Sequence, residues 1–211
     1  MDYNKLISEK ETISLRINSI LNNCSFELSI KFLVYIHDYL FKDILYNNGH
    51  IRKDNLEKPE EILNGNSIHY SDYSVIISLI RFAINKEKNI NYKNISIDNL
   101  IINISNFISR IWLIHPFIEG NTRTVCVFLE EYLRSLGYNV NNDIFKENAL
   151  YFRNALVRSN YENIELGIKK DNRALILFLN KVLIDHNISL DENLLKIPEL
   201  FTDVKKKTKR K

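Results

Sequence analysis

Residues 115–123, which read HPFIEGNTR, combine the side chains and backbone features that phosphate chemistry requires. An apolar helix is predicted to end at His115, because Pro116 opposes its continuation. A second helix is predicted to begin at about Thr122, and the amide groups of its first turn carry the positive end of the helix dipole. This helix-loop-helix segment therefore predicts an anion-binding site.

The side chains of the loop could supply a base, a metal ligand and phosphate contacts. Histidine titrates near neutrality, so His115 could accept the proton of a hydroxyl that attacks a phosphate. Glu119 would repel phosphate unless a cation lay between them, and a carboxylate bridged to phosphate by Mg²⁺ is usual in phosphoryl transfer. Gly120 and Asn121 tolerate left-handed backbone conformations, which allows a nest of N–H groups. Arg123 adds a guanidinium suited to phosphate.

Each of these residues also has an ordinary structural explanation. A histidine beside a proline often only ends a helix, Glu119 could cap a helix, and Gly-Asn is a common turn. Their coincidence within nine residues favours a phosphate-binding enzyme. The residues alone leave both explanations open.

The loop resembles the signature of the Fic family, H-P-F-x-(D/E)-G-N-G-R-x-x-R, which here reads HPFIEGNTRTVC. Members of that family mostly transfer AMP from ATP to Ser, Thr or Tyr hydroxyls of target proteins. The resemblance extends over roughly residues 26–185, because LFKDILY and GHIR in 40–52 are similar to the family's approach to its flap, and 63–73 to the flap. It implies an all-α Fic fold, a helical bundle core with a short β-hairpin flap over the active-site loop.

The resemblance also implies a role for individual residues. His115 would be the catalytic base, Glu119 the ligand of Mg²⁺, and Phe117 the anchor of the loop in the core. The nucleotide-binding residues would be Gly120, Asn121, Thr122, Arg123, Ser67 and Ile68. The flap would hold the extended backbone of the target by strand addition. Its target-binding residues would be Ile68, His69 and Tyr70.

Two positions depart from the family signature. Thr122 replaces a glycine, which a helical position tolerates. Cys126 replaces the second arginine, which in the family binds the γ-phosphate and pairs with an inhibitory glutamate. The family's inhibitory pattern, (S/T)-x-x-x-E-(G/N), has no strict match in the chain. Three alternatives follow: a small antitoxin-like protein restrains the activity, another device does, or nothing does.

The resulting hypothesis is a protein adenylyltransferase. ATP would be its substrate, Mg²⁺ its cofactor, and a target protein with a hydroxyl side chain its partner. One alternative is a nucleotidyltransferase that uses another nucleoside triphosphate, and a second is a nucleotide- or partner-binding module with little catalysis. Retention of His115 and Glu119 favours catalysis, because a binding module needs no base. Removal of AMP would require a second acid that activates water, and no residue is singled out for that.

The elements that must position the loop are predicted as helices from their apolar periodicity. They cover residues up to about 23 and the ranges 26–45, 73–84, 97–114, 122–136, 145–158 and 173–186. The second is predicted to end at Asn47-Asn48-Gly49. Residues 67–70 follow the turn Asn64-Gly65-Asn66 and predict a short hairpin. We divide the chain into an amino-terminal helix (1–25), a Fic domain (26–190) and a carboxy-terminal extension (191–211).

Composition narrows the class of protein further. A chain of 211 residues that is 45% hydrophobic fits one globular domain. Cys24 and Cys126 have no CxxC neighbour, which argues against disulfides and structural zinc and fits a reducing compartment. The sequence has neither a secretory signal nor a stretch of membrane-spanning length, so we expect a cytoplasmic protein without a membrane partner.

A run of positive charge lies at residues 205–211. Six of these seven residues are Lys or Arg, which leaves the rest of the chain with a net negative charge. Such a run is typical of a solvated, disordered segment. Because the rest of the chain is not basic, we do not expect nucleic acid as a partner.

Overall fold

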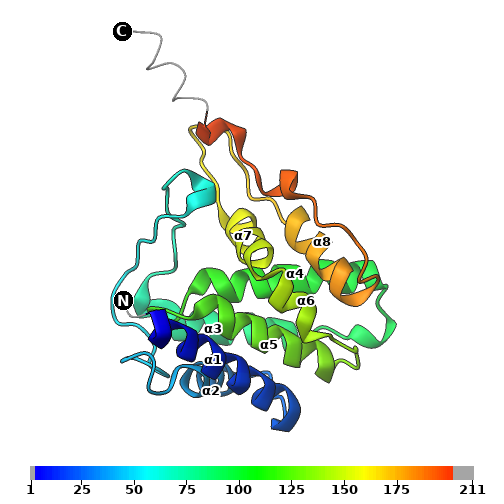
Figure 1. Ribbon diagram of the computed structural model, residues 1–211. Coiled ribbons are helices and arrows are strands. Elements are labelled where there is room, and N and C mark those ends of the chain that lie inside the picture. The colour runs from blue at the N-terminus through cyan, green and yellow to red at the C-terminus, as the bar shows by residue number, and fades with distance from the viewer. Residues whose placement is uncertain (1–2, 202–211) are drawn as a thin grey trace. The chain divides into compact units, whose positions relative to one another are not determined.

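The computed structural model describes residues 3–201, which form eight α-helices and five short 3₁₀ helices and contain no strand (Figure 1). The chain divides into two compact units. The segments of the two units alternate along the sequence, so the domain predicted for 26–190 contributes to both. That division and its boundaries stay a prediction, and the basic run at 205–211 lies outside the described residues.

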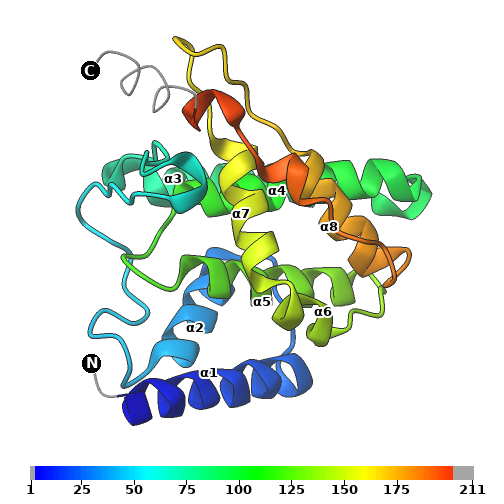
Figure 2. The same cartoon turned by 45° about the horizontal axis from the view of Figure 1, so that its top comes forward.

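The first unit contains the residues up to Asn55 together with Ser71–Asn94 and Ile114–Val140. Its helices are α1 (Tyr3–Asn23), α2 (Ile30–Phe41), α3 (Ile76–Lys88) and α5 (Asn121–Ser135). Helices α1 and α2 pack on each other and on α5 (Figure 2). Helix α2 also packs on α3. Helix α5 is therefore held by two neighbours along its length.

Aromatic rings fill the core between α2 and α5. The ring of Phe26 lies 5.3 Å from that of Phe32 and 5.5 Å from those of Phe128 and Tyr132, measured between centroids. The hydroxyl of Tyr132 also donates to the buried carboxylate of Glu87 at 2.9 Å. These contacts fix α5, whose first three residues form the end of the candidate loop at 115–123.

The second unit contains Leu56–Tyr70, Ile95–Leu113 and the chain from Asn141 onward. Its helices are α4 (Ile97–Ile114), whose last residue belongs to the first unit, α6 (Asn142–Glu147), α7 (Ala149–Asn160) and α8 (Arg173–Leu183). Helix α7 packs on α6 and α8, which lie beside it (Figure 1). The hydroxyl groups of Ser109 and Ser159 lie 2.8 Å apart and link α4 to α7.

Four helices differ from the predicted ranges by three residues or more. The range 73–84 corresponds to α3 at Ile76–Lys88, and 173–186 to α8 at Arg173–Leu183. The helix predicted for 26–45 begins at Ile30, because the Ser29 hydroxyl accepts the Phe32 N–H at 3.1 Å and caps α2. The helix ends at Phe41, before the predicted end at Asn47-Asn48-Gly49, and turns follow it. Gly49 has the positive φ expected of it, 69°, but it lies in these turns and not at the end of a helix. The helix predicted for 145–158 is interrupted at Asn148, which separates α6 from α7.

The predicted hairpin at residues 67–70 is not confirmed. Only an isolated bridge pairs Pro59 with Ser67 in this segment. Between them the Glu60 N–H donates to Asn66 O at 2.9 Å and the Gly65 N–H to Glu60 O at 3.0 Å. These bonds close a compact loop around a 3₁₀ turn. Pairing does not continue beyond the bridge, where the Lys58 N–H donates to the Ser67 hydroxyl and not to a backbone carbonyl.

Within residues 3–201, no helix is long and apolar enough to cross a lipid bilayer.

Candidate active site

Helix α4 delivers His115 to the start of the loop in an unusual backbone conformation. The chain leaves α4 after Ile114, and His115 has φ 51°, in the left-handed region. A non-glycine residue is strained there and needs support from its surroundings. His115 is 4% exposed, so a reaction at its imidazole would be largely shielded from water.

Arg52 provides much of that support. Its Nε–H donates to His115 O at 2.8 Å, and its backbone N–H donates to Pro116 O at 2.9 Å. Its guanidinium also donates to Ile114 O at 3.3 Å, to Asp54 O at 2.6 Å and to Ser71 O. Arg52 is 3% exposed, and burial lowers its pKa although Asp72 opposes this effect. The buried cation thus closes the end of α4 and fixes the backbone on both sides of His115.

Asn121 holds the middle of the loop. Its Oδ1 accepts the Phe117 N–H at 3.0 Å, and its Nδ2 donates to Phe117 O at 2.7 Å. Both residues are buried, and the Phe117 ring anchors the loop in the core as the resemblance implies. The Asn121 side chain therefore has a structural task, and only its backbone N–H is left for an anion.

His37 of α2 contacts the loop from inside the unit. Its ring stacks on Phe117 with centroids 3.7 Å apart and planes at 12°. Its Nδ1 accepts the Gly49 N–H at 2.9 Å, and its Nε2 lies 3.0 Å from Glu119 O. Burial lowers the pKa of His37 to about 4, more than the backbone of Glu119 and the charge of Asp38 raise it. The ring is therefore neutral at physiological pH.

Gly120 is required by both its backbone and its surroundings. It adopts φ 76°, and a Cβ built on it would lie 2.4 Å from Cε2 of Phe41. The same Phe41 ring lies under the guanidinium of Arg123, whose Cζ is 4.8 Å from the ring centroid. Phe41 therefore forms a floor beneath the end of the loop and orients Arg123.

The start of α5 is the candidate anion site. Its first backbone bond is donated by Thr124 to Gly120 O at 3.0 Å, so the amides before Thr124 lie at the positive end of the helix. Thr122 is half-buried and Arg123 is exposed there. An anion at this helix end would meet backbone N–H groups and a guanidinium together.

Glu119 is the candidate ligand for Mg²⁺. It is exposed and directly precedes Gly120 and the amides of α5. No group of three or more metal-ligating side chains occurs in the described part of the chain, so no closed protein cage is built. Mg²⁺ in phosphoryl transfer is commonly held by one or two carboxylates together with substrate phosphates, and a single exposed carboxylate beside an anion site fits that pattern.

Cys126 lies one helical turn beyond the loop, at the position of the second signature arginine. Its Sγ is 3.7 Å from Oε1 of the fully buried Glu130. Burial raises the pKa of the Cys126 thiol and raises that of Glu130 to about 8. This site therefore holds a protonated thiol beside a largely protonated carboxyl where the family signature has a cation.

A cavity of about 420 Å³ lies beside Phe41 and Arg123 in the same unit. Its walls are mostly apolar, with charged groups from α1 and α5 at the rim. They consist of Glu9, Lys10, Ile13, Phe41, Ile44, Leu45 and Arg123.

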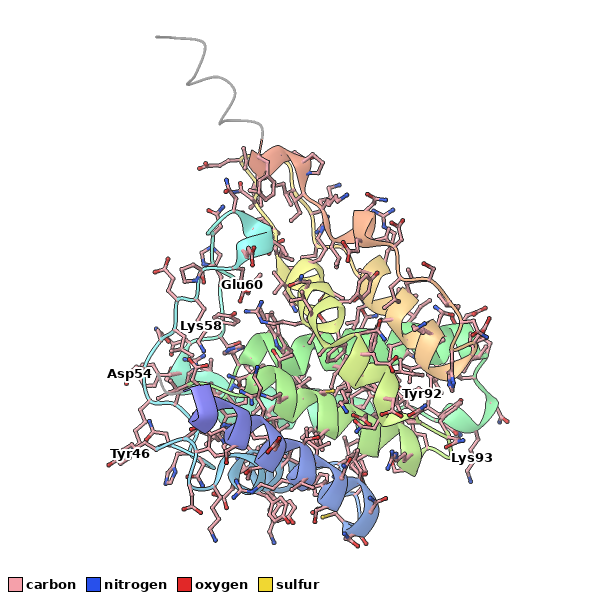
Figure 3. All side chains as sticks on the ribbon, in the orientation of Figure 1. Tyr46, Asp54, Lys58, Glu60, Tyr92 and Lys93 are labelled. Atoms are coloured by element: carbon pink, nitrogen blue, oxygen red, sulfur yellow. The ribbon has the colours of Figure 1, made fainter. Side chains whose placement is uncertain are left out.

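The expected flap residues belong to the second unit. The Ser67 hydroxyl accepts the Lys58 N–H at 2.9 Å, and the Ile68 side chain is buried. The His69 side chain is exposed. The Tyr70 hydroxyl donates to the carboxylate of Glu60 at 3.3 Å, and burial raises the pKa of Tyr70. Glu60, which is labelled in Figure 3, in turn pairs with Arg153, and the two charged groups lie 2.7 Å apart. The roles of the four residues 67–70 toward nucleotide and target stay predictions.

The first unit thus brings together His115, Glu119, Gly120, Asn121, Thr122 and Arg123. Sequence reasoning assigned no role to His37, Phe41 or Arg52, although each contacts the loop or its helix. His37 lies 82 positions from Glu119, and Arg52 lies 63 positions from His115. The available signals were the segments LFKDILY, which contains Phe41, and GHIR, which contains Arg52, and both carry part of the resemblance.

The family model described as Fic/DOC family matches residues 27–133, just over half of the chain. No curated protein sequence matches significantly.

Solved structures with similar folds come from Bartonella. The N-terminal Fic domain of an effector from Bartonella sp. AR 15-3 matches with TM-score 0.68 and 18% identity, over 92% of this chain and 88% of that chain. BepC of Bartonella tribocorum with bound AMPPNP matches with TM-score 0.66 and 16% identity, over 86% and 87% of the two chains. A Fic-domain effector of Bartonella quintana with bound ADP matches with TM-score 0.66 and 15% identity, over 92% and 89%. At these identities the likeness establishes the fold.

Proposed function

The chain belongs to the Fic/DOC family, and we propose that it transfers AMP from ATP to a Ser, Thr or Tyr hydroxyl of a target protein, with release of pyrophosphate. One observation carries the proposal most directly. A buried histidine directly follows α4, and five residues later a left-handed glycine caps the start of α5, so a base and a helix-end anion site belong to one loop. A module that only bound nucleotide would have no need of the base.

The proposed reaction is a displacement at the α-phosphorus of ATP. A hydroxyl oxygen of the target attacks that phosphorus, and the bond to the oxygen bridging the α- and β-phosphates breaks. Pyrophosphate leaves with the electron pair of this bond. His115 accepts the hydroxyl proton as the new P–O bond forms, and its burial limits competition by water.

The start of α5 would hold the phosphates. The amides of Gly120, Asn121 and Thr122 would donate to phosphate oxygens, and Arg123 would offset the charge that develops on the leaving group. Phe41 supports both ends of this arrangement, because it lies under Arg123 and against Gly120. Mg²⁺, held by Glu119 and the phosphates, would neutralise charge on the leaving group.

The target would be held by the segment 67–70. Its backbone would pair with an extended stretch of the target, and Ile68, His69 and Tyr70 would contact the residues around the acceptor hydroxyl. Ser67 and Ile68 would also contact the nucleotide. The network of Tyr70, Glu60 and Arg153 would keep this segment in place.

Transfer of label from α-³²P-ATP to protein in a cell lysate tests this function. The intact protein with Mg²⁺ should label discrete protein bands, and His115→Ala should label none. His186→Ala, which changes an exposed histidine of the second unit, is the matched control and should label as the intact protein does. Labelling that persists with His115→Ala would show that His115 is not the catalytic base.

The nucleotide itself is tested by competition. Unlabelled ATP should suppress the bands at lower concentrations than GTP, CTP or UTP do. If another nucleoside triphosphate competes better, the chain is a nucleotidyltransferase with that donor. The same loop would serve, because its contacts are to phosphate and not to the base.

A second candidate function follows from Cys126. The neutral thiol stands where the signature has a cation for the γ-phosphate, which weakens the case for ATP turnover. Under this alternative the chain binds nucleotide or a partner protein with little catalysis. Calorimetric binding of ATP without labelled protein bands in any lysate would favour it.

Restraint of the activity by a small antitoxin-like protein is a separate proposal. Copurification of a small protein that abolishes labelling would support it. If the chain purified alone labels fully, and labelling is unchanged when the lysate from which it was purified is added back, this proposal is contradicted.

A further inference from the structure

The imidazole of His37 bridges two backbone groups that are far apart in the sequence. Its Nδ1 accepts the Gly49 N–H at 2.9 Å, and its Nε2 lies 3.0 Å from the carbonyl oxygen of Glu119. The residue is 1% exposed and its ring stacks on Phe117. Both ring nitrogens of this buried side chain are therefore paired, and each pairs with the backbone of a different loop.

The two partners determine which ring nitrogen carries the proton. A backbone N–H can only donate, so Nδ1 must present a lone pair to Gly49. The carbonyl oxygen of Glu119 can only accept, so Nε2 must carry the hydrogen and donate it. Only this neutral tautomer satisfies both groups. In the other tautomer the Nδ1–H would face the N–H of Gly49, and the lone pair of Nε2 would face the carbonyl oxygen of Glu119.

The bond to Glu119 O fixes more than one atom. The carbonyl of Glu119 and the N–H of Gly120 belong to one planar peptide, and in a trans peptide the two bonds point in opposite directions. His37 holds the oxygen toward the interior of the unit, so the Gly120 N–H points away from it, at the start of α5. The Asn121 side chain bonds to the N–H and the carbonyl oxygen of Phe117 and so restrains the two peptides on either side of that residue.

A peptide that precedes a glycine is easily reversed, because glycine accepts both signs of φ. Reversal would replace the Gly120 N–H by the Glu119 carbonyl oxygen on the outer side. An anion that meets backbone donors in one orientation would then meet an acceptor. The orientation of this single peptide therefore decides whether the loop attracts or repels phosphate.

We propose that His37 is a positioning residue that locks the peptide between Glu119 and Gly120, so that the Gly120 N–H is presented to the phosphates of the nucleotide. The proposal rests on the proposed function of the loop. It assigns to His37 no contact with nucleotide and no proton transfer. Its effect passes entirely through the Glu119 carbonyl.

Two substitutions separate the lock from simple packing. His37→Phe keeps a flat ring against Phe117 and removes both hydrogen bonds. His37→Gln offers an acceptor and a donor that are bonded to one carbon, as the two ring nitrogens of histidine are, and can restore both hydrogen bonds. Tyr39→Phe is the matched control, because it removes a hydrogen bond from the same helix, to Ser19, away from the loop.

Calorimetric binding of a non-hydrolysable ATP analogue with Mg²⁺ provides the first measurement. His37→Phe should weaken binding by at least about tenfold, and His37→Gln should remain within about threefold of the intact protein, as expected for one bond to a charged ligand. Tyr39→Phe should bind as the intact protein does. A folded His37→Phe variant with unchanged affinity would overturn the proposal, as would a folded His37→Gln variant that is as weak as His37→Phe.

A second measurement does not depend on the function of the loop. Nitrogen-15 spectra of the ring should show a neutral His37 with the proton on Nε2, and a crystal structure of His37→Phe should show the Glu119 carbonyl turned outward in at least part of the molecules. A proton on Nδ1, or an unchanged peptide in the variant, would overturn the lock even if nucleotide binds. If the intact protein binds no nucleotide while both observations hold, the proposed function fails and the lock stands.

Discussion

The Nε–H of Arg52 donates to the carbonyl oxygen of His115 at 2.8 Å, across 63 positions of the sequence. The bond secures the one loop residue that has a positive φ without being glycine. The backbone N–H of Arg52 adds a bond to Pro116 O on the far side of His115. Arg52 thus holds the proposed base through its backbone on both sides of the residue.

Replacement of Arg52 should therefore unfold the site along with the activity. Arg52→Met removes the donors from several carbonyl groups, including those of Ile114 and His115, and should lower the free energy of unfolding by about 3 kcal/mol. Denaturation in urea measures this. Arg81→Met, which changes an exposed arginine of α3, should shift the free energy by less than about 0.5 kcal/mol. Equal effects of the two variants would contradict the assigned support.

Gly120→Ala tests the contact between the loop and its aromatic floor. The added Cβ would lie 2.4 Å from Phe41 in a left-handed backbone, so we expect a loss of at least about 2 kcal/mol of stability and loss of nucleotide binding. Gly137→Ala is the control, since φ there is also positive but no atom lies within 4 Å of the new Cβ. That variant should lose only about 1 kcal/mol and bind nucleotide normally.

The helices on either side of the loop were predictable because their apolar residues recur with a clear period. The ranges 97–114 and 122–136 agree with α4 and α5 to within a residue. The predicted hairpin is not confirmed, and its segment contains only one bridge, between Pro59 and Ser67. Pro59 has no N–H to donate, and the Lys58 N–H donates to the Ser67 hydroxyl and not to a backbone carbonyl. The sequence pattern did not reveal that this side chain takes the backbone donor.

The supports of the site could not be predicted for a different reason. His37 looks like an ordinary residue of an apolar helix, and its partners Gly49 and Glu119 come from distant turns and loops. Spacing within a helix identifies its buried face but not the loop that reaches it. The motif was therefore visible in the sequence, whereas the residues that hold it in one conformation required the fold.

Glu130 should make stability depend on pH. Its pKa is raised to about 8, mainly by burial, against an ordinary value of 4.5. Between these values the folded protein keeps a proton that the unfolded chain has released, so stability is fully present below about pH 4.5 and is lost as the pH rises toward 8. The expected slope is on the order of 1 kcal/mol per pH unit. Denaturation at a series of pH values measures it.

Glu130→Gln provides the comparison, because it keeps the shape and removes the titration. Its free energy of unfolding should fall less steeply over the same interval, and the two proteins should differ most near pH 8. Parallel pH profiles would show that Glu130 does not titrate in this range.

Cys126→Arg tests the departure from the family signature. An added guanidinium one turn beyond Arg123 should strengthen ATP binding by about tenfold and increase transfer, if the phosphates lie at the start of α5. Cys126→Ser, which introduces no charge, should leave the affinity within about twofold. Calorimetry with ATP distinguishes the two, and an unchanged affinity for Cys126→Arg would place the phosphates elsewhere.

The central claim, transfer of AMP through His115, is tested most directly by comparing ATP labelled at the α-phosphate with ATP labelled at the γ-phosphate. Incubated with lysate and Mg²⁺, the intact protein should place the α-label on target proteins and release the γ-label as pyrophosphate, while His115→Ala should do neither. If the γ-label appears on protein, the chain transfers a phosphoryl group instead. If the α-label appears on protein equally with His115→Ala, the loop is not the catalytic site.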